Sequence, residues 1–218
     1  MMKYMFPLLL IGLFSCQQKQ DQYDSLQPSE ATISDVPLDS LLRKKLETIR
    51  AEDQVLRMML PDLNKRYDRA AEEQTAFRKL MVQQDSLCEI KIRKILDEHG
   101  WISAERVGYM ANQTLWLVIQ HAPLATQIEY LPMLKESVNT GGSDGWYLAF
   151  LEDRINMRQG KKQVYGSQAK PNDITGKTHI YPIENVATVN ERRLSIGLKT
   201  IEEYAVANGH VFNLEEHK

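Results

Sequence analysis

Apolar residues recur every three or four positions over most of the chain after residue 35, which is the spacing of amphipathic helices. Residues that favour the start or the end of a helix divide this pattern into separate helices. Pro37 suits the first turn of a helix, and Pro123 and Gly160 each end an apolar run. The predicted helices cover residues 37–60, 62–98, 109–121, 124–138, 146–159, 189–196 and 200–207. The first two are expected to form an antiparallel hairpin that turns near Pro61, and a short turn is expected to begin at Ser103.

The character of the chain changes after Gly160. Residues 163–168 and 178–183 are short β-prone runs separated by proline, asparagine, aspartate and glycine, which predicts a two-stranded hairpin. An isolated hairpin is marginal in water, so this one is expected to pack on the helices. The predicted fold is therefore mainly α, a helical bundle of about six to seven helices with a small two-stranded β-hairpin near the C-terminus.

The first residues carry a different pattern, in which Lys3 is followed by an apolar run over residues 4–14 and then by Cys16. This run is too short to span a bilayer, which takes about 20 apolar residues, and its layout is that of a cleaved secretory signal. Its ending, LFSC, resembles the lipobox of bacterial lipoproteins, in which the cysteine is acylated and becomes the new N-terminus. An ordinary signal peptide that leaves a free cysteine is the alternative.

The lipobox resemblance predicts how the chain is divided. Residues 1–15 are expected to be a lipoprotein signal peptide, residues 16–34 the acylated Cys16 with a polar, flexible tether, and residues 35–218 a single helical domain. The protein is then expected in the cell envelope, anchored by lipid to a bacterial membrane on its periplasmic side or at the cell surface. Its expected partners are that membrane and either a small polar ligand or an envelope protein.

Composition narrows the classes of function. The chain is 43% hydrophobic and 26% charged, as in ordinary globular proteins, and its formal net charge of −2 does not suggest a nucleic-acid partner. If Cys16 carries lipid, Cys88 is the only other cysteine and no intramolecular disulfide can form. Cys88 falls on the apolar face of its predicted helix, so we expect it to be a core residue.

The sequence signatures of common catalytic and cofactor sites are missing. There is no histidine pair at metal-binding helical spacing, no paired cysteines, no nucleophile elbow, and no dinucleotide or Walker fingerprint. We therefore expect neither a metal nor a cofactor. Any site must be found among polar residues that stand where packing alone would place apolar ones.

Charged residues interrupt the apolar stripes of three predicted helices. Asp53 stands where a leucine is expected, with Arg57 one turn later. His121 lies in the last turn of the most apolar helix, where the helix dipole favours the imidazolium form. Asp153 and Arg154 lie beside and between the two apolar stripes of their helix. Since buried charges need partners, each of these residues belongs either to a structural ion pair or to a functional site.

Several short strings accompany these residues: WLVIQH, ending in His121, the Asp153-Arg154 pair, QVYGSQ, PIE and ERR. As a set they resemble an uncharacterised bacterial family, a domain of unknown function. The group of Asp53, Gln54 and Arg57 is similar to the version found in lipoproteins of Bacteroides-type organisms. The resemblance covers residues 53–204 and implies no activity, only that these polar residues occur together.

We expect six polar residues to meet in one cleft between the central helices and the hairpin. They are His121, Asp153, Arg154, Tyr165, Gln168 and Glu184. The first hypothesis is a binding module in which arginines and Tyr165 hold an anionic or sugar-like ligand. Its expected ligand-binding residues are Arg154, Tyr165, Gln168, Arg192, Asp53 and Arg57.

The alternative hypothesis is an envelope hydrolase. In it His121 acts as the base, and Asp153 or Glu184 orients the imidazole or serves as the acid. A third hypothesis is an interacting lipoprotein whose polar residues form only a structural network. Because no nucleophile or metal set is recognisable, binding or interaction comes first, and the sequence leaves open whether the protein is an enzyme.

Overall fold

The computed structural model describes residues 39–68, 70–172 and 176–217. The expected signal peptide, Cys16 and the tether lie outside these residues and stay predictions. In the described part of the chain, no helix combines the length and the apolar character needed to cross a membrane.

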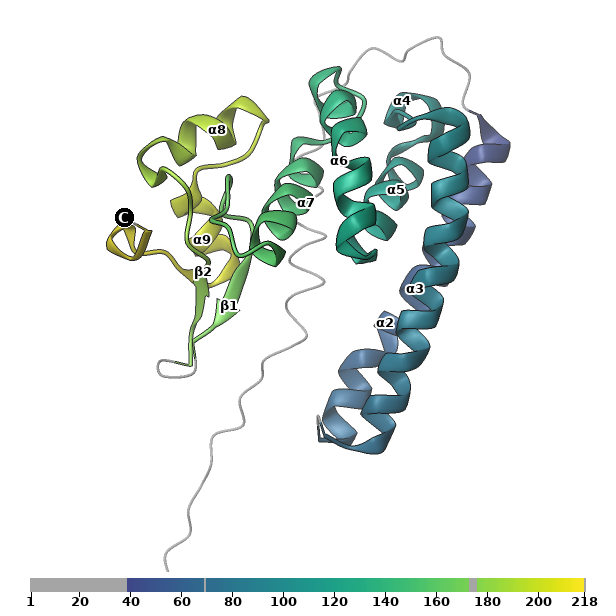
Figure 1. Ribbon diagram of the computed structural model, residues 1–218, viewed down its shortest axis with the longest axis horizontal. Helices are drawn as coiled ribbons and strands as arrows, with labels where there is room; N and C mark the ends of the chain where they lie inside the picture. The colour runs from purple at the N-terminus through teal and green to yellow at the C-terminus, as the bar shows by residue number, and fades with distance from the viewer. Residues whose placement is uncertain (1–38, 69, 173–175, 218) are drawn as a thin grey trace, which may run out of the picture.

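The described residues form eight α-helices and a small sheet, which confirms the mainly α fold (Figure 1). The helices are α2 (Ser40–Arg66), α3 (Glu72–His99), α4 (Ala104–Val107), α5 (Tyr109–His121), α6 (Leu124–Asn139), α7 (Gly145–Arg158), α8 (Val189–Ser195) and α9 (Ile201–Asn208). Two 3₁₀ helices, η1 (Val186–Thr188) and η2 (Leu214–His217), precede α8 and follow α9. The helix beyond those predicted is α4, a single turn at the place where Ser103 predicted a turn.

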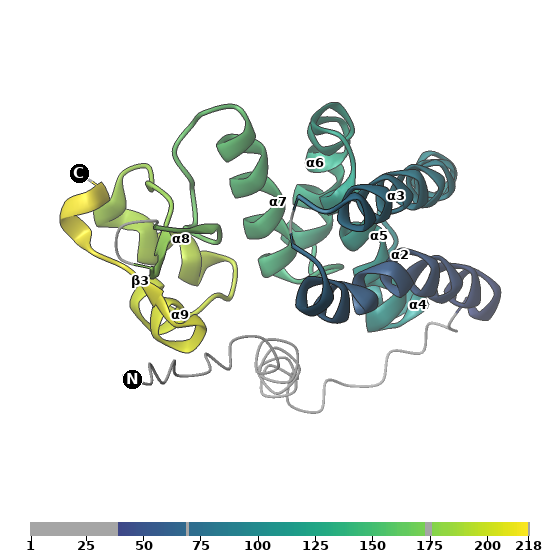
Figure 2. The ribbon, with the colours of Figure 1, turned by 90° about the horizontal axis from the view of Figure 1, so that it is seen from below.

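Helices α2 and α3 lie side by side and antiparallel, as predicted (Figures 1 and 2). The predicted turn near Pro61 was wrong, because α2 continues through Pro61 to Arg66, and α3 begins at Glu72. Proline removes one backbone hydrogen bond, and packing against α3 maintains the helix despite this loss. The buried Gln74 donates to Asn64 Oδ1 at 2.9 Å and to the Tyr67 carbonyl at 3.4 Å, which ties the start of α3 to the end of α2.

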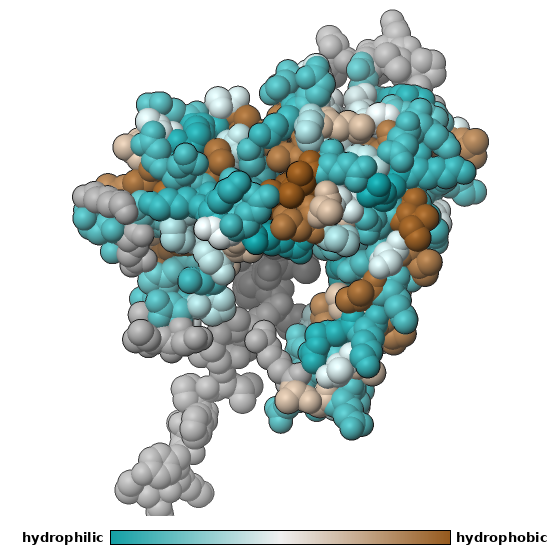
Figure 3. Space-filling model, viewed as in Figure 1, coloured by the Kyte–Doolittle hydropathy of each residue, from teal (hydrophilic) through white to brown (hydrophobic). Residues whose placement is uncertain are grey.

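The distal half of this helical hairpin, residues 54–87, projects beyond the rest of the body, and we call it the hairpin arm (Figure 1). The buried residues of α2 end at Asp53, and before Cys88 only Gln74 and Phe77 of α3 are buried. Several large apolar side chains of the arm are exposed. Figure 3 shows hydrophobic side chains along the hairpin on an otherwise largely hydrophilic face. The arm is therefore held mainly by contacts between its own two helices.

Helix α5 is the centre of the larger apolar core. Nine of its residues are buried, and it contacts α2, α3, α6 and α7. Neighbours on several sides explain why its sequence is apolar around nearly the whole helix. Cys88 is completely buried in the same core, which confirms that it is a core residue.

Aromatic rings join α5 to α7. The Trp116 ring stacks on Tyr147 with centroids 5.2 Å apart and meets Trp146 edge-on at 4.5 Å. Phe150 contacts both tryptophans edge-on. Such rings bury large areas in defined geometries, so they fix the orientation of α7 and of the charged residues on its following turns.

The C-terminal part contains a sheet of three short strands, β1 (Ala169–Pro171), β2 (Thr178–Ile180) and β3 (His210–Val211), in the order β1-β2-β3. Strands β1 and β2 form an antiparallel hairpin as predicted, but its first strand is residues 169–171 and not residues 163–168, and β3 pairs parallel to β2. The third strand was not predicted, because a two-residue strand leaves no periodicity to read. The sheet packs on α8 and α9 through a second apolar cluster, which consists of Ile180, Ile183, Val189, Ile201 and Ala205.

Residues 163–168 form a loop, although their composition predicted a strand, and we call them the Asp153 loop. Val164 and Tyr165 donate their backbone N–H groups to Asp153 Oδ1 at 2.7 and 3.0 Å, and Ser167 donates its own to Oδ2 at 2.7 Å. A strand would give these groups to a neighbouring strand. Their capture by a buried carboxylate therefore replaces the expected pairing.

Gly166 allows the Asp153 loop to pass close to the second apolar cluster. Its φ is +72°, and a Cβ at this position would lie 2.7 Å from Ile183 Cδ1 and 2.8 Å from Ile201 Cδ1. Only glycine combines this left-handed backbone with such a close approach.

Replacing Asp153 with alanine should destabilise the protein strongly. The change leaves three N–H groups of the loop without their acceptor, and each unsatisfied buried group costs about 1–3 kcal/mol. We expect urea unfolding of the full chain to show a loss of about 3 kcal/mol or more. The control is Glu152→Ala, which removes the neighbouring carboxylate and its pair with Lys135 and should cost about 1 kcal/mol or less. Equal losses in the two variants would contradict this account of the loop.

Candidate functional site

His121 and Asp53 form a hydrogen-bonded pair between α5 and α2. His121 Nδ1 lies 3.1 Å from Asp53 Oδ1, the Asp53 side chain is completely buried, and the His121 side chain is 20% exposed. A carboxylate can only accept, so Nδ1 carries the proton of this hydrogen bond. When the imidazole is neutral, its Nε2 is then the free base.

Two further side chains, Gln54 and Arg57, hold Asp53, and Arg57 extends the pair to Asp85. Gln54 donates to Asp53 Oδ2 at 2.6 Å, and Arg57 Nη1 lies 3.4 Å from the same oxygen. Arg57 also donates to the Asp53 carbonyl at 2.6 Å and, through Nη2, to Asp85 Oδ1 at 2.7 Å. We call Asp53, Arg57, Asp85 and His121 the His121 network, and it joins α2, α3 and α5.

The charge of Asp53 is set by this network. Burial by itself would raise the pKa of Asp53, but the hydrogen bond and charge of His121, with Arg57 and Gln54, lower that pKa below its ordinary value of 3.8. Asp53 is therefore ionised at neutral pH. It can fix the orientation of the His121 ring and its tautomer.

The same network offers donor atoms suited to a metal ion. One atom from each of Asp53, Asp85 and His121 lies within 4.8 Å of the other two. Arg57, however, already contacts both carboxylates with its guanidinium group. The positive charge that these carboxylates need is thus supplied by the chain itself, and we assign the group to an ion-pair network.

Arg154 differs from the other charged residues of α7. Among the described residues no carboxylate pairs with it, and its buried Nε has no hydrogen-bond partner. Burial, and then the charge of Arg158, lower the pKa of Arg154 below its ordinary value. Both effects oppose a positive charge at this position, and an anion beside Arg154 would reverse them.

Contacts on the turns before and after Arg154 show what lies beside this part of α7. One turn before it, Gln120 donates to the Phe150 carbonyl at 3.3 Å, and one turn after it, Arg158 donates to the Ala122 carbonyl at 3.0 Å. Residues four apart lie on one face of a helix. These contacts place the turns of α7 before and after Arg154 beside the C-terminal end of α5.

Two side-chain amides meet at the Phe150 carbonyl, one helical turn before Arg154. Gln168 donates to the Phe150 carbonyl at 3.4 Å and to Ser167 Oγ at 3.2 Å, next to the amide of Gln120. Gln120 is 3% exposed, and its Oε1 has no hydrogen-bond partner among the described residues. We call Gln120, His121, Arg154, Arg158 and Gln168 the Arg154 site. It combines unpaired positive charge with an unused acceptor.

The other predicted site residues lie around the Asp153 loop. Burial raises the pKa of Asp153, and the three N–H groups that it accepts oppose this. Burial, followed by the charges of Glu152 and Asp153, raises the pKa of Tyr165 to about 12. Arg192 donates to the carbonyls of Val164 at 2.8 Å and Glu184 at 2.6 Å.

The predicted residues thus fall into three groups, which are the His121 network, the Arg154 site with Arg154 and Gln168, and the residues around the Asp153 loop. His121, Asp53 and Arg57 belong to the His121 network, whereas both oxygens of Asp153 are occupied by the loop. The Glu184 side chain is exposed, and its main chain binds Gln163. The described contacts pair His121 with Asp53, and the catalytic and ligand-binding roles stay predictions.

Sequence reasoning missed Asp85, Gln120, Arg158 and Arg193. Arg158 follows Arg154 by four residues, so helical spacing could have revealed it. Arg193 is 2% exposed and donates to the carbonyls of Tyr165 and Lys199, but nothing in the sequence separates it from its neighbour Arg192. Asp85 lies on another helix, 28 residues beyond Arg57, and no local pattern links them.

Comparison with curated proteins and with solved structures gave no match for this chain. A family model, described as a family of unknown function, matches residues 41–215, which include the His121 network, the Arg154 site and the Asp153 loop. The resemblance to an uncharacterised family is therefore confirmed, while the Bacteroides-type lipoprotein context stays a prediction. The chain belongs to the family of unknown function DUF6624.

Proposed function

We propose that this is a lipid-anchored protein of the cell envelope whose helical domain binds a small anionic, hydroxylated ligand at the Arg154 site. The observation that supports this best is Arg154 itself, a half-buried cation with no ion pair among the described residues. Removing a charge from water without a partner is unfavourable by several kcal/mol. A ligand anion would provide the missing partner.

The class of ligand follows from the groups at the site. A guanidinium group presents parallel N–H donors that match a carboxylate or phosphate. Arg158 adds positive charge one turn away, while the unused Gln120 Oε1 would accept a hydrogen bond from a hydroxyl group. A sugar acid carries both kinds of group, so we take glucuronate as the probe.

Replacing Arg154 with methionine should weaken this binding without destabilising the fold. Methionine keeps the length and apolar stem of the side chain but removes its unpaired charge. Loss of a charge-assisted hydrogen bond, about 1.5–3 kcal/mol, corresponds to about 10–100-fold weaker binding of glucuronate in calorimetry. The free energy of unfolding in urea should stay equal or rise.

The control for this test is Arg43→Met, which removes an exposed arginine of α2 and should leave glucuronate binding unchanged. If the parent protein does not bind glucuronate or another sugar acid, the ligand class is wrong. If Arg154→Met binds normally but is less stable than the parent, Arg154 has a structural role and the proposed site is wrong.

Membrane attachment rests on the N-terminal apolar run and the LFSC string. Replacing Cys16 with serine removes the thiol that would carry the lipid. We expect the variant to lose incorporation of radiolabelled palmitate and to leave the membrane fraction of expressing cells, whereas Cys88→Ala should keep the label. Unchanged labelling of the Cys16→Ser variant would exclude acylation at this residue.

A hydrolase is the second candidate, and the His121–Asp53 hydrogen bond is the observation that favours it. A carboxylate that orients an imidazole, whose other nitrogen is free to take a proton, is the arrangement of a general base. In this candidate Asp53 has the orienting role that the sequence assigned to Asp153 or Glu184. Arg154 would hold the anionic group of the substrate next to the base.

Replacing His121 with alanine separates catalysis from structure. If His121 is a general base, hydrolysis of a chromogenic ester that keeps a free glucuronate carboxylate should fall by about 10²–10⁴-fold. The loss of its hydrogen bond to Asp53 should lower the free energy of unfolding by about 1–3 kcal/mol, which leaves the protein folded. The control is His99→Ala, at the exposed end of α3. A parent protein without hydrolytic activity on such esters, or a variant that loses only stability, would leave binding as the function.

A further inference from the structure

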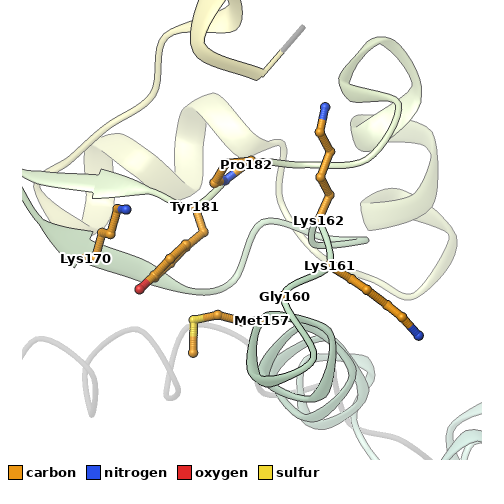
Figure 4. Close-up of a pocket in the computed structure, with 7 residues that line it drawn as sticks. All are labelled: Met157, Gly160, Lys161, Lys162, Lys170, Tyr181 and Pro182. Carbon is orange, nitrogen blue, oxygen red and sulfur yellow. The ribbon is translucent and has the colours of Figure 1, made fainter.

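A hollow lies at the end of α7, and none of its lining residues belongs to the Arg154 site. Its volume is about 360 Å³, and its walls come from the end of α7, the segment that follows it, β1 and the end of β2 (Figure 4). The lining residues are Met157, Gly160, Lys161, Lys162, Lys170, Tyr181 and Pro182. We call this the lysine hollow.

The lysine hollow has positive charge that the chain does not neutralise. Three of its seven lining residues are lysines, and none of the seven is acidic. Among the described residues, neither Lys161, Lys162 nor Lys170 takes part in an ion pair. Lys162 Nζ donates a hydrogen bond to the backbone carbonyl of His217 at 3.4 Å, and this neutral acceptor does not balance the lysine charge. An anion in the hollow would therefore find no competing carboxylate on its walls.

The rest of the wall is apolar and includes one aromatic ring. Lys170 Nζ lies 4.9 Å from the centroid of the Tyr181 ring, which holds the charge against the ring face. Figure 4 shows Met157 facing Tyr181 from the end of α7, while Lys161 and Lys162 extend from the rim in different directions. Lysine side chains are long and carry compact charges, so both can turn toward a bound anion.

Charge and shape together indicate the ligand. Compact ammonium groups suit phosphate, whose charge is not confined to one plane, better than they suit bidentate recognition of a carboxylate. The Tyr181 ring and Pro182 offer a flat surface for the C–H face of a sugar or a glycerol unit. A volume of 360 Å³ is at the small end of ligand pockets, which fits a phosphorylated headgroup and not a whole lipid.

We propose that the lysine hollow binds a phosphate ester of a sugar or of glycerol. The ester is either free in solution or part of the headgroup of an anionic phospholipid, since both offer the same chemistry. The proposal is independent of the Arg154 site, because the two share no residue and their ligands differ in the anionic group.

The test is calorimetric titration of the full chain in detergent at fixed ionic strength. Glucose 6-phosphate and glycerol 1-phosphate represent the soluble esters, and short-chain phosphatidylglycerol represents the lipid, with short-chain phosphatidylcholine as its neutral match. We expect glucose 6-phosphate, phosphatidylglycerol or both to bind. Inorganic phosphate should bind more weakly than the esters, and glucose should not bind.

Variants locate the binding. Replacing Lys161, Lys162 and Lys170 together with glutamine should weaken binding by about tenfold or more. The matched control replaces Lys44, Lys45 and Lys79, exposed lysines of α2 and α3, with glutamine and should leave binding unchanged. Tyr181→Ala should reduce the affinity for glucose 6-phosphate to that for inorganic phosphate. Arg154→Met should leave phosphate-ester binding intact, which separates this proposal from the proposed function.

Each result decides the proposal. Binding of phosphatidylglycerol but not of the soluble esters assigns the hollow to lipid headgroups, and the reverse assigns it to soluble phosphates. The proposal is overturned if no phosphate ester binds. It is also overturned if the two lysine triples weaken binding equally, since general positive charge would then explain the affinity.

Discussion

Two completely buried carboxylates govern how the parts of this molecule fit together, because a charge removed from water must be met by donors. Asp153 is met by three backbone N–H groups of the Asp153 loop. The carbonyls on the loop are held in turn by Arg192 and Arg193 of α8. Negative charge from α7 and positive charge from α8 thus fix the loop between them, and the C-terminal sheet follows directly from the end of this loop.

Asp53 is also met by hydrogen-bond donors, but they are of a different kind, and this difference distinguishes a structural carboxylate from one that can take part in chemistry. The partners of Asp153 are backbone groups that can do nothing else. The partners of Asp53 are side chains, and one of them, His121, keeps a second nitrogen and a partly exposed edge. A buried carboxylate that is hydrogen-bonded to a titratable ring, such as Asp53, can take part in binding or proton transfer. A buried carboxylate whose partners are all backbone N–H groups, such as Asp153, only stabilises a conformation.

The sequence predicted the helices well because their apolar periodicity reflects burial. The bounds of α5 follow from its apolar run and Pro123, and the predicted helix over residues 200–207 is α9, which begins with a capping box at Thr200. The errors arose where a distant group overrides a local preference. Residues 163–168 have strand-like composition, but Asp153 takes their N–H groups, and Pro61 stays helical because α3 packs beside it. The pairing of Arg57 with Asp85 crosses two helices, so no local spacing could predict it.

The His121 network lies at the base of the hairpin arm, so local opening of the arm affects the network. Asp53 is the last buried residue of α2, and Arg57 and Asp85 lie just beyond it, where the two helices leave the body. A segment with few buried contacts opens locally at lower free energy than the core to which it is attached. Separation of the two helices at this point would break the Arg57–Asp85 pair and alter the electrostatic environment of His121. Such coupling is reciprocal, so a ligand that binds beside His121 would also change how often the hairpin arm opens. Slower amide hydrogen exchange in residues 54–87 would then report binding at the C-terminal end of α5.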